Sequence, residues 1–98
     1  MLFVVIFTDK PDQAALRVSL LGAHIEWLEQ HKEVIPIGGS LRTELGQTPK
    51  GGLWIAEAES KEMLDTLIKT DPFYTAGLRA NVEILYWSKA NAERKATF

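Results

Sequence analysis

LRVSLLGAHIEWLEQH, residues 16–31, is the longest helical pattern in the sequence. At about 100° per residue, a set of apolar residues falls on one broad face of this helix. Its members are Leu16, Leu20, Ala23, Trp27 and Leu28. His24 falls within the same face, and Arg17 and His31 follow the same row seven residues before and after it, about two helical turns away. We therefore expect a titratable ring to point at the core or into a cleft.

Four strands are predicted around this helix. We expect them at residues 2–8, 34–39, 53–59 and 81–88, because β-branched and aromatic residues dominate these runs. The first reads as a central strand buried on both faces. The second and third form a long hairpin through residues 46–52, where glycine and proline are dense.

Polar residues mark the helix ends. The first helix has Asp12 or Asp9 as its predicted N-cap and runs to about Lys32. Gly22 interrupts it, either as a tolerated weak spot or because a backbone or ligand approaches closely. Ser60 caps a shorter helix that ends near residue 70. The segment 71–77, DPFYTAG, then reads as a short helical turn with an aspartate cap, a proline at its first position and a glycine stop.

The element order βαββαβ is that of the ferredoxin-like α+β fold. It places a four-stranded antiparallel sheet against two helices that share one face. Since the strands also carry apolar residues on their other side, a second sheet should cover that face, most simply from an identical chain. We predict one domain over residues 1–88, a polar tail over 89–98 and a homodimer.

Composition excludes several classes of function. The 98 residues carry a formal net charge of −2, which offers no basic field for nucleic acid or an anionic membrane. There is no cysteine, so disulfides and thiolate chemistry are absent, as suits a reducing compartment. The apolar start MLFVVIFTDK has no basic region or cleavage site typical of a signal peptide. We expect a cytoplasmic protein.

The sequence resembles the YCII family of small dimeric α/β-barrel proteins. The resemblance lies in the first strand LFVVIFTD, in Arg17 followed seven residues later by His24, in Gly38-Gly39, in GLWIAEAES and in Asp71-Pro72-Phe73 with Gly77. It covers residues 2 to about 88. The family's paired histidine and aspartate correspond to His24 and Asp71, which the resemblance implies as catalytic residues. Leu21 and the loop 42–52 depart from the family pattern. The muconolactone isomerases share the barrel and the MLF start but not the Asp-Pro-Phe segment.

Such a pair is chemically useful. An aspartate that accepts a hydrogen bond from one ring nitrogen of histidine fixes the tautomer and makes the other nitrogen more basic. The alternative is that Asp71 only caps a helix and His24 is a satisfied core histidine.

Further residues are candidates for holding a substrate. Arg17 could bind a carboxylate or phenolate, and Ser40 follows a strand whose backbone N–H groups could meet a substrate oxygen. Trp27 and Phe73 could wall a pocket for a planar ligand, although core packing is the default for such residues. His31 suits the helix C-terminus through the dipole. Residues 46–52 lack Walker spacing, and two histidines seven residues apart are too distant for one ion, so we predict no cofactor and no metal.

Two functions follow. One is a small cofactor-free enzyme, a lyase, isomerase or dehalogenase, that uses His24 and Asp71 for acid/base chemistry on a small carbonyl or phenolic compound. The other is a non-catalytic dimeric protein that binds a small ligand in the same cleft.

Overall fold

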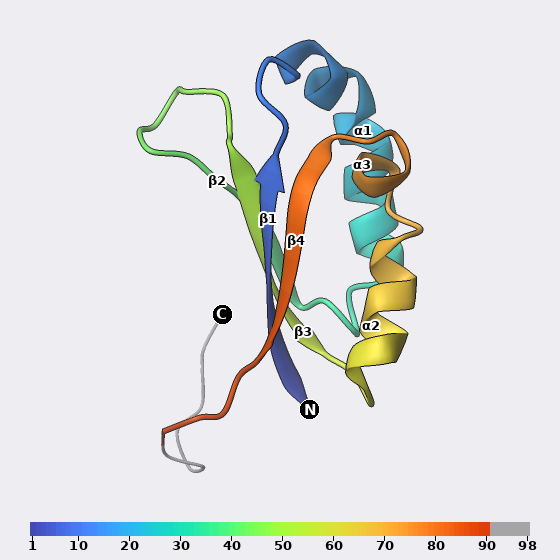
Figure 1. Ribbon diagram of the computed structural model, residues 1–98. Coiled ribbons are helices and arrows are strands. Elements are labelled where there is room, and N and C mark those ends of the chain that lie inside the picture. The colour runs from blue at the N-terminus through green and yellow to red at the C-terminus, as the bar shows by residue number, and fades with distance from the viewer. Residues whose placement is uncertain (91–98) are drawn as a thin grey trace.

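The computed structural model describes residues 1–90 and contains the predicted βαββαβ order with one extra helical turn (Figure 1). The strands are β1 (Leu2–Asp9), β2 (Ile37–Leu41), β3 (Gly51–Glu57) and β4 (Arg79–Tyr86). The helices are α1 (Ala14–Gln30), α2 (Lys61–Ile68) and α3 (Pro72–Thr75). This is the ferredoxin-like α+β fold expected from the sequence.

The strands form one antiparallel sheet in the order β2-β3-β1-β4, so β1 is an inner strand, as predicted. All the helices lie on one side of the sheet (Figure 1). Val5 is a good reference point, since it pairs with Trp54 of β3 on one side and with Ile84 of β4 on the other. The strong pairing of β1 reflects its run of β-branched and aromatic residues.

The core lies between this side of the sheet and the helices. Alternate residues of β1 and β3 point into it, which is the period of two expected for a strand with one buried side. The buried members of the core cluster are Phe3, Val5, Phe7, Trp27, Ile35, Trp54, Ala56, Leu64 and Ile68.

The opposite side of the sheet carries a row of apolar side chains that crosses all four strands. The register places Ile37, Ile55, Val4 and Leu85 directly beside one another. Within this chain Val4 and Ile55 are only partly covered, and Leu85 is 44% exposed. The prediction that β1 is buried on both faces therefore does not hold for residues 1–90 of a single chain, which cover this face only in part.

Several boundaries differ from the prediction. Gln13 precedes α1 and makes no side-chain cap, whereas Asp9 ends β1 and binds two arginines instead. The second strand begins at Ile37 because the amides of Val34 and Ile35 donate to the His31 carbonyl and close a turn after the helix. The other caps are as predicted, since the Ser60 hydroxyl accepts from the Met63 amide.

Two other predictions meet the structure only in part. The predicted tail begins at residue 89, and residues 91–98 lie outside the described part of the chain. Within residues 1–90, no helix is long and apolar enough to cross a membrane.

Candidate active site

His24 and Asp71 lie in contact although they are 47 positions apart in the sequence. The Nδ1 atom of His24, on α1, is 2.7 Å from Oδ1 of Asp71, which precedes α3. His24 is 7% exposed and Asp71 is fully buried. The structure thus brings together the two residues that the family resemblance pairs.

The Asp-Pro start of α3 explains how Asp71 reaches this position. Its Oδ1 atom accepts a hydrogen bond from the Phe73 amide at 3.2 Å, so the carboxylate caps the helix while it binds the histidine. Pro72 occupies the first helical position, where a missing N–H costs nothing. Gly77, with a φ of 80°, lets the chain leave the helix toward β4.

Aromatic rings hold the plane of the His24 imidazole. The Phe73 ring lies nearly parallel to it, with centroids 3.9 Å apart and 11° between the planes. The Trp54 ring stacks at 6.4 Å and 22°. Phe73, predicted as a pocket wall, is fully buried and contacts His24 directly.

The hydrogen bond assigns different tasks to the two ring nitrogens. An ionised carboxylate can only accept, so with Asp71 ionised the Nδ1 atom of His24 carries the proton. Nε2 then keeps a lone pair and has no hydrogen-bond partner among residues 1–90. The arrangement can take a proton from a ligand and return it.

A second charged cluster near this pair is made of Asp9, Arg17 and Arg79. Asp9 is shared by two arginines, with its Oδ2 atom 3.1 Å from Arg17 Nε and its Oδ1 atom 2.7 Å from Arg79 Nη1. Both guanidinium groups also lie over the Phe73 ring, at 4.9 and 5.0 Å from its centroid. Burial lowers the pKa of Arg79, while the hydrogen bond and charge of Asp9 and the charge of Asp71 act in the opposite direction.

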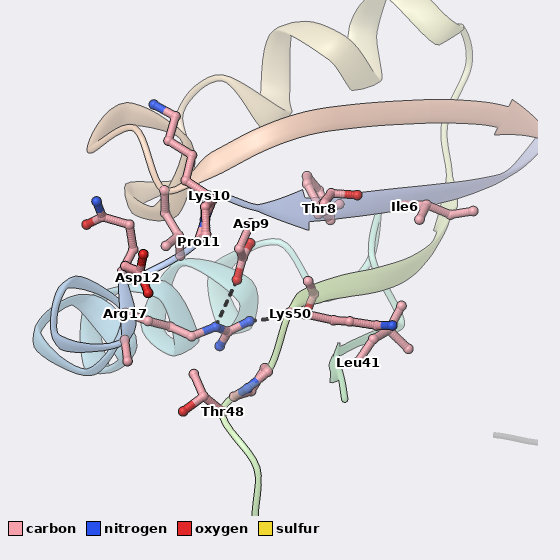
Figure 2. Close-up of a pocket in the computed structure, with 16 residues that line it drawn as sticks. Ile6, Thr8, Asp9, Lys10, Pro11, Asp12, Arg17, Leu41, Thr48 and Lys50 are labelled. Carbon is pink, nitrogen blue, oxygen red and sulfur yellow. Dashed lines mark hydrogen bonds and ion pairs between the residues drawn. The ribbon is translucent and has the colours of Figure 1, made fainter. Parts of the chain in front are cut away.

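The Arg17 side chain makes more hydrogen bonds within the protein than the sequence suggested. Figure 2 shows its side chain reaching from α1 to Asp9 and to the start of β3, where Nη2 donates to the Gly51 carbonyl at 3.2 Å. Two of its nitrogens are therefore occupied by the protein itself. The sequence left Arg17 free to bind a substrate oxygen, because nothing in the pattern showed that Asp9 ends a strand beside it.

The His24 ring lines a cavity of ≈ 340 Å³ between α1, β2 and the β2–β3 loop. Its lining residues include no aspartate or glutamate. They are Ala14, Arg17, Val18, Leu21, His24, Ile25, Leu28, Gly38, Gly39, Ser40, Arg42, Thr48, Pro49 and Arg79. Apolar walls with a few basic and hydroxyl groups suit a small, flat, negatively charged ligand.

A neighbouring cavity of ≈ 650 Å³ opens at the start of α1 (Figure 2). Arg17, Thr48 and Pro49 line both spaces, so the loop before β3 and the Arg17 side chain lie between them. Lys10 and Lys50 line only this larger cavity. The His24 cavity therefore adjoins a larger space whose lining carries both signs of charge, since Asp9 and Asp12 line it together with Lys10, Arg17 and Lys50.

The remaining candidates lie in different places. Ser40 lines the cavity and its hydroxyl accepts from Arg42 at 2.8 Å. Trp27 belongs to the core, where it stacks on Trp54 and donates to Thr70, and is not among the residues lining the His24 cavity. His31 follows α1 as its C-cap, with its ring 4.5 Å from Trp27.

Gly22 interrupts α1 without a close neighbour. A Cβ atom at Gly22 would meet nothing within 4 Å, which supports the prediction of a tolerated weak spot.

Three charged residues around the candidate site, Asp9, Arg79 and Arg42, were not predicted from the sequence as site residues. Asp9 resembled a helix cap because Pro11 follows it, and an arginine between Leu78 and Ala80 gave no signal beyond a single charge among apolar residues.

These features define a small α+β protein with an antiparallel sheet and a buried histidine–aspartate pair. The chain belongs to the YCII-related domain family, whose model matches residues 1–88. Comparison with curated protein sequences found no match.

Solved structures share the fold. A 5-chloro-2-hydroxyhydroquinone dehydrochlorinase, TftG from Burkholderia phenoliruptrix AC1100, solved with 2,5-dihydroxybenzoquinone, is 33% identical with a TM-score of 0.82. The match covers 90% of this chain and 94% of that one. A protein from Bacteroides thetaiotaomicron assigned to the antibiotic biosynthesis monooxygenases is 12% identical, with a TM-score of 0.57 and coverage of 99% and 95%. The latter likeness concerns the fold alone.

Proposed function

We propose that this protein is an enzyme that uses side-chain acid/base chemistry, with no cofactor, on a small phenolic or quinonoid compound. The observation that carries the proposal is the His24–Asp71 hydrogen bond beside a cavity with no acidic lining residue. Asp71 holds Nδ1, and Nε2 is left for a ligand. The cavity of ≈ 340 Å³ suits a single substituted ring.

The reaction class follows from what one base can do. Nε2 of His24 takes the proton of one ring hydroxyl, and the imidazolium returns it to the neighbouring ring carbon that carries the halide, which gives a ketone beside a tetrahedral C–X carbon. Nε2 then takes the proton of the hydroxyl para to that ketone. The electron pair left on this oxygen forms a second C=O bond, the adjacent ring double bond shifts toward the C–X carbon, and the C–X bond breaks as the halide leaves with its electron pair. The product is a quinone, and the substrate has lost HX in total. Without a leaving group, the imidazolium returns the proton to another atom and the product is an isomer. Asp71 stabilises the imidazolium in both cases.

The relative supports the first of these outcomes. A protein that is 33% identical over 90% of this chain is a dehydrochlorinase of a chlorinated hydroxyhydroquinone. We therefore propose elimination of a halide from a hydroxylated ring as the reaction of this chain, with Ser40 beside a ring oxygen.

We also infer that the protein is a homodimer. The apolar row of Val4, Ile37, Ile55 and Leu85 is only partly covered by residues 1–90 of a single chain, and an isologous pair of sheets would bury it.

Turnover of chlorinated hydroxyhydroquinones, followed by chloride release, tests the proposal. His24→Gln should lower the turnover number by about 10²- to 10⁴-fold. His31→Gln is the matched control, because it changes the chain's other histidine at the far end of α1 and should leave the rate unchanged. Chloride release that His24→Gln does not alter would contradict the assignment. Binding without turnover in the unaltered protein would favour the non-catalytic alternative.

A further inference from the structure

The basic residues around the His24 cavity differ in how much of their charge is already paired. Arg17 and Arg79 share the Asp9 carboxylate and are each 8% exposed. Arg42 is exposed, and within residues 1–90 it makes no ion pair. Among the cavity's arginines it is the one whose charge is open to a ligand.

The geometry of β2 places Arg42 on the same side as the cavity. A Cβ atom at Gly38 would meet Trp54 and Leu28 side chains at 3.1 and 3.3 Å, so position 38 faces the helices. Side chains alternate along a strand, which puts Ser40 on that same side, and Arg42 follows in step. The hydrogen bond of 2.8 Å from Arg42 Nη2 to Ser40 Oγ agrees with this direction.

The hydrogen bond from Arg42 to Ser40 leaves a donor on each side chain available to an acceptor atom of a ligand. Because the Ser40 oxygen accepts from Arg42, its own O–H proton is available to a ligand. The guanidinium keeps further N–H groups and a full positive charge. A hydroxyl and a guanidinium side by side match a single ionised oxygen, or the two oxygens of a carboxylate.

We propose that Arg42, supported by Ser40, is the specificity-determining residue that selects substrates with an ionised ring oxygen or a ring carboxylate. This proposal rests on the proposed function and specifies the substrate class of that site. The anion lies at the β2 edge of the cavity, and the reacting part of the ring lies toward His24 on α1. Arg17 then serves chiefly to hold Asp9 and the start of β3.

Binding can be measured separately from catalysis in the His24→Gln protein. The anionic probe is 2,5-dihydroxybenzoquinone and the neutral probe is hydroquinone, each titrated by calorimetry or by two-dimensional NMR. Adding Arg42→Gln should lower the affinity for the anionic probe by about 10- to 100-fold and leave the affinity for the neutral probe unchanged. Arg42→Lys should restore part of the lost affinity. Ser40→Ala should also weaken binding of the anionic probe, and the double variant with Arg42→Gln should lose less affinity than the two single losses added together. Affinity for the anion should also fall with added salt in the parent protein.

Lys50→Gln is the matched control, since this lysine lines the neighbouring cavity but not that of His24. This substitution should leave the affinity for both probes unchanged. Equal weakening of both probes by Arg42→Gln, or no change in either, overturns the assignment of Arg42 and leaves the proposed function standing. If neither probe binds the parent protein, the substrate class itself is wrong and both proposals fail. With His24 present, Arg42→Gln should raise KM with little change in kcat, whereas a fall in kcat alone would contradict a binding role.

Discussion

The Phe73 ring lies 3.9 Å from the His24 ring and nearly parallel to it. Phe73 and Asp71 restrain the imidazole in complementary ways, because one fixes the ring plane and the other fixes Nδ1. Both come from the three-residue segment Asp71-Pro72-Phe73, and the Phe73 amide donates to the Asp71 carboxylate. One short turn therefore orients the proposed base from two directions.

Asp71→Asn should separate catalysis from helix capping. Asparagine is an equally good N-cap, so α3 should form, but a neutral amide stabilises an imidazolium poorly. We expect turnover to fall by about 10²-fold or more with a thermal midpoint within a few degrees of the parent. Ser60→Ala is the control, since it removes the cap of α2 and should cost about 1 kcal/mol of stability without loss of turnover. Full activity in Asp71→Asn would contradict the role of the pair.

Asp9→Asn should unfold the protein at a lower denaturant concentration. It leaves the Arg17 and Arg79 guanidinium groups buried without their shared carboxylate, and breaking a buried pair costs about 3–5 kcal/mol. Urea unfolding measures the loss. The exposed pair of Lys32 and Glu29, with atoms 3.0 Å apart, gives the comparison, since Glu29→Gln should cost less than about 0.5 kcal/mol. Equal losses in both variants would show that the Asp9 cluster is not a buried network.

Gly51→Ala should damage the sheet where β3 begins. A Cβ atom there would collide with the Phe7 backbone carbonyl of β1, and backbone cannot move aside as a side chain can. We expect a loss of about 1–3 kcal/mol in free energy of unfolding. Gly39→Ala on β2 is the matched change, because its Cβ would meet nothing within 4 Å and it should be close to neutral. The prediction fails if the two alanine variants are equally stable.

Leu85→Glu should dissociate the proposed dimer. Leu85 lies on the open side of the sheet and is 44% exposed, so the charge costs the single chain little. In a dimer it would be buried without a partner, which is strongly unfavourable. Sedimentation velocity at micromolar concentration should show a dimer for the parent and a monomer for the variant. Met63→Glu on α2, at 56% exposure, should remain dimeric. A monomeric parent protein would refute the dimer.

Much of the fold could be predicted from local patterns. The runs of β-branched and aromatic residues at 2–8 and 81–88 located β1 and β4, and the Asp-Pro and Ser caps located α3 and α2, because strand propensity and cap chemistry act within a few residues. The predicted N-cap of α1 was wrong. Asp9 had the local features of a cap, and its two arginine partners lie 8 and 70 positions away.

The element order, the inward direction of His24 and the short turn that carries Asp71 could all be predicted from local sequence patterns. Periodicity and capping encode these, since each depends on neighbours along the chain. Which arginine keeps its charge available to a ligand depends on contacts made in the folded chain. The sequence does not show which of Arg17 and Arg42 is paired with a carboxylate. The β1–β3 pairing puts Asp9 and Gly51 beside Arg17, while Arg42 follows the edge strand β2 and lines the cavity. Charge pairing is set by contacts between distant segments, and those exist only once the sheet has formed.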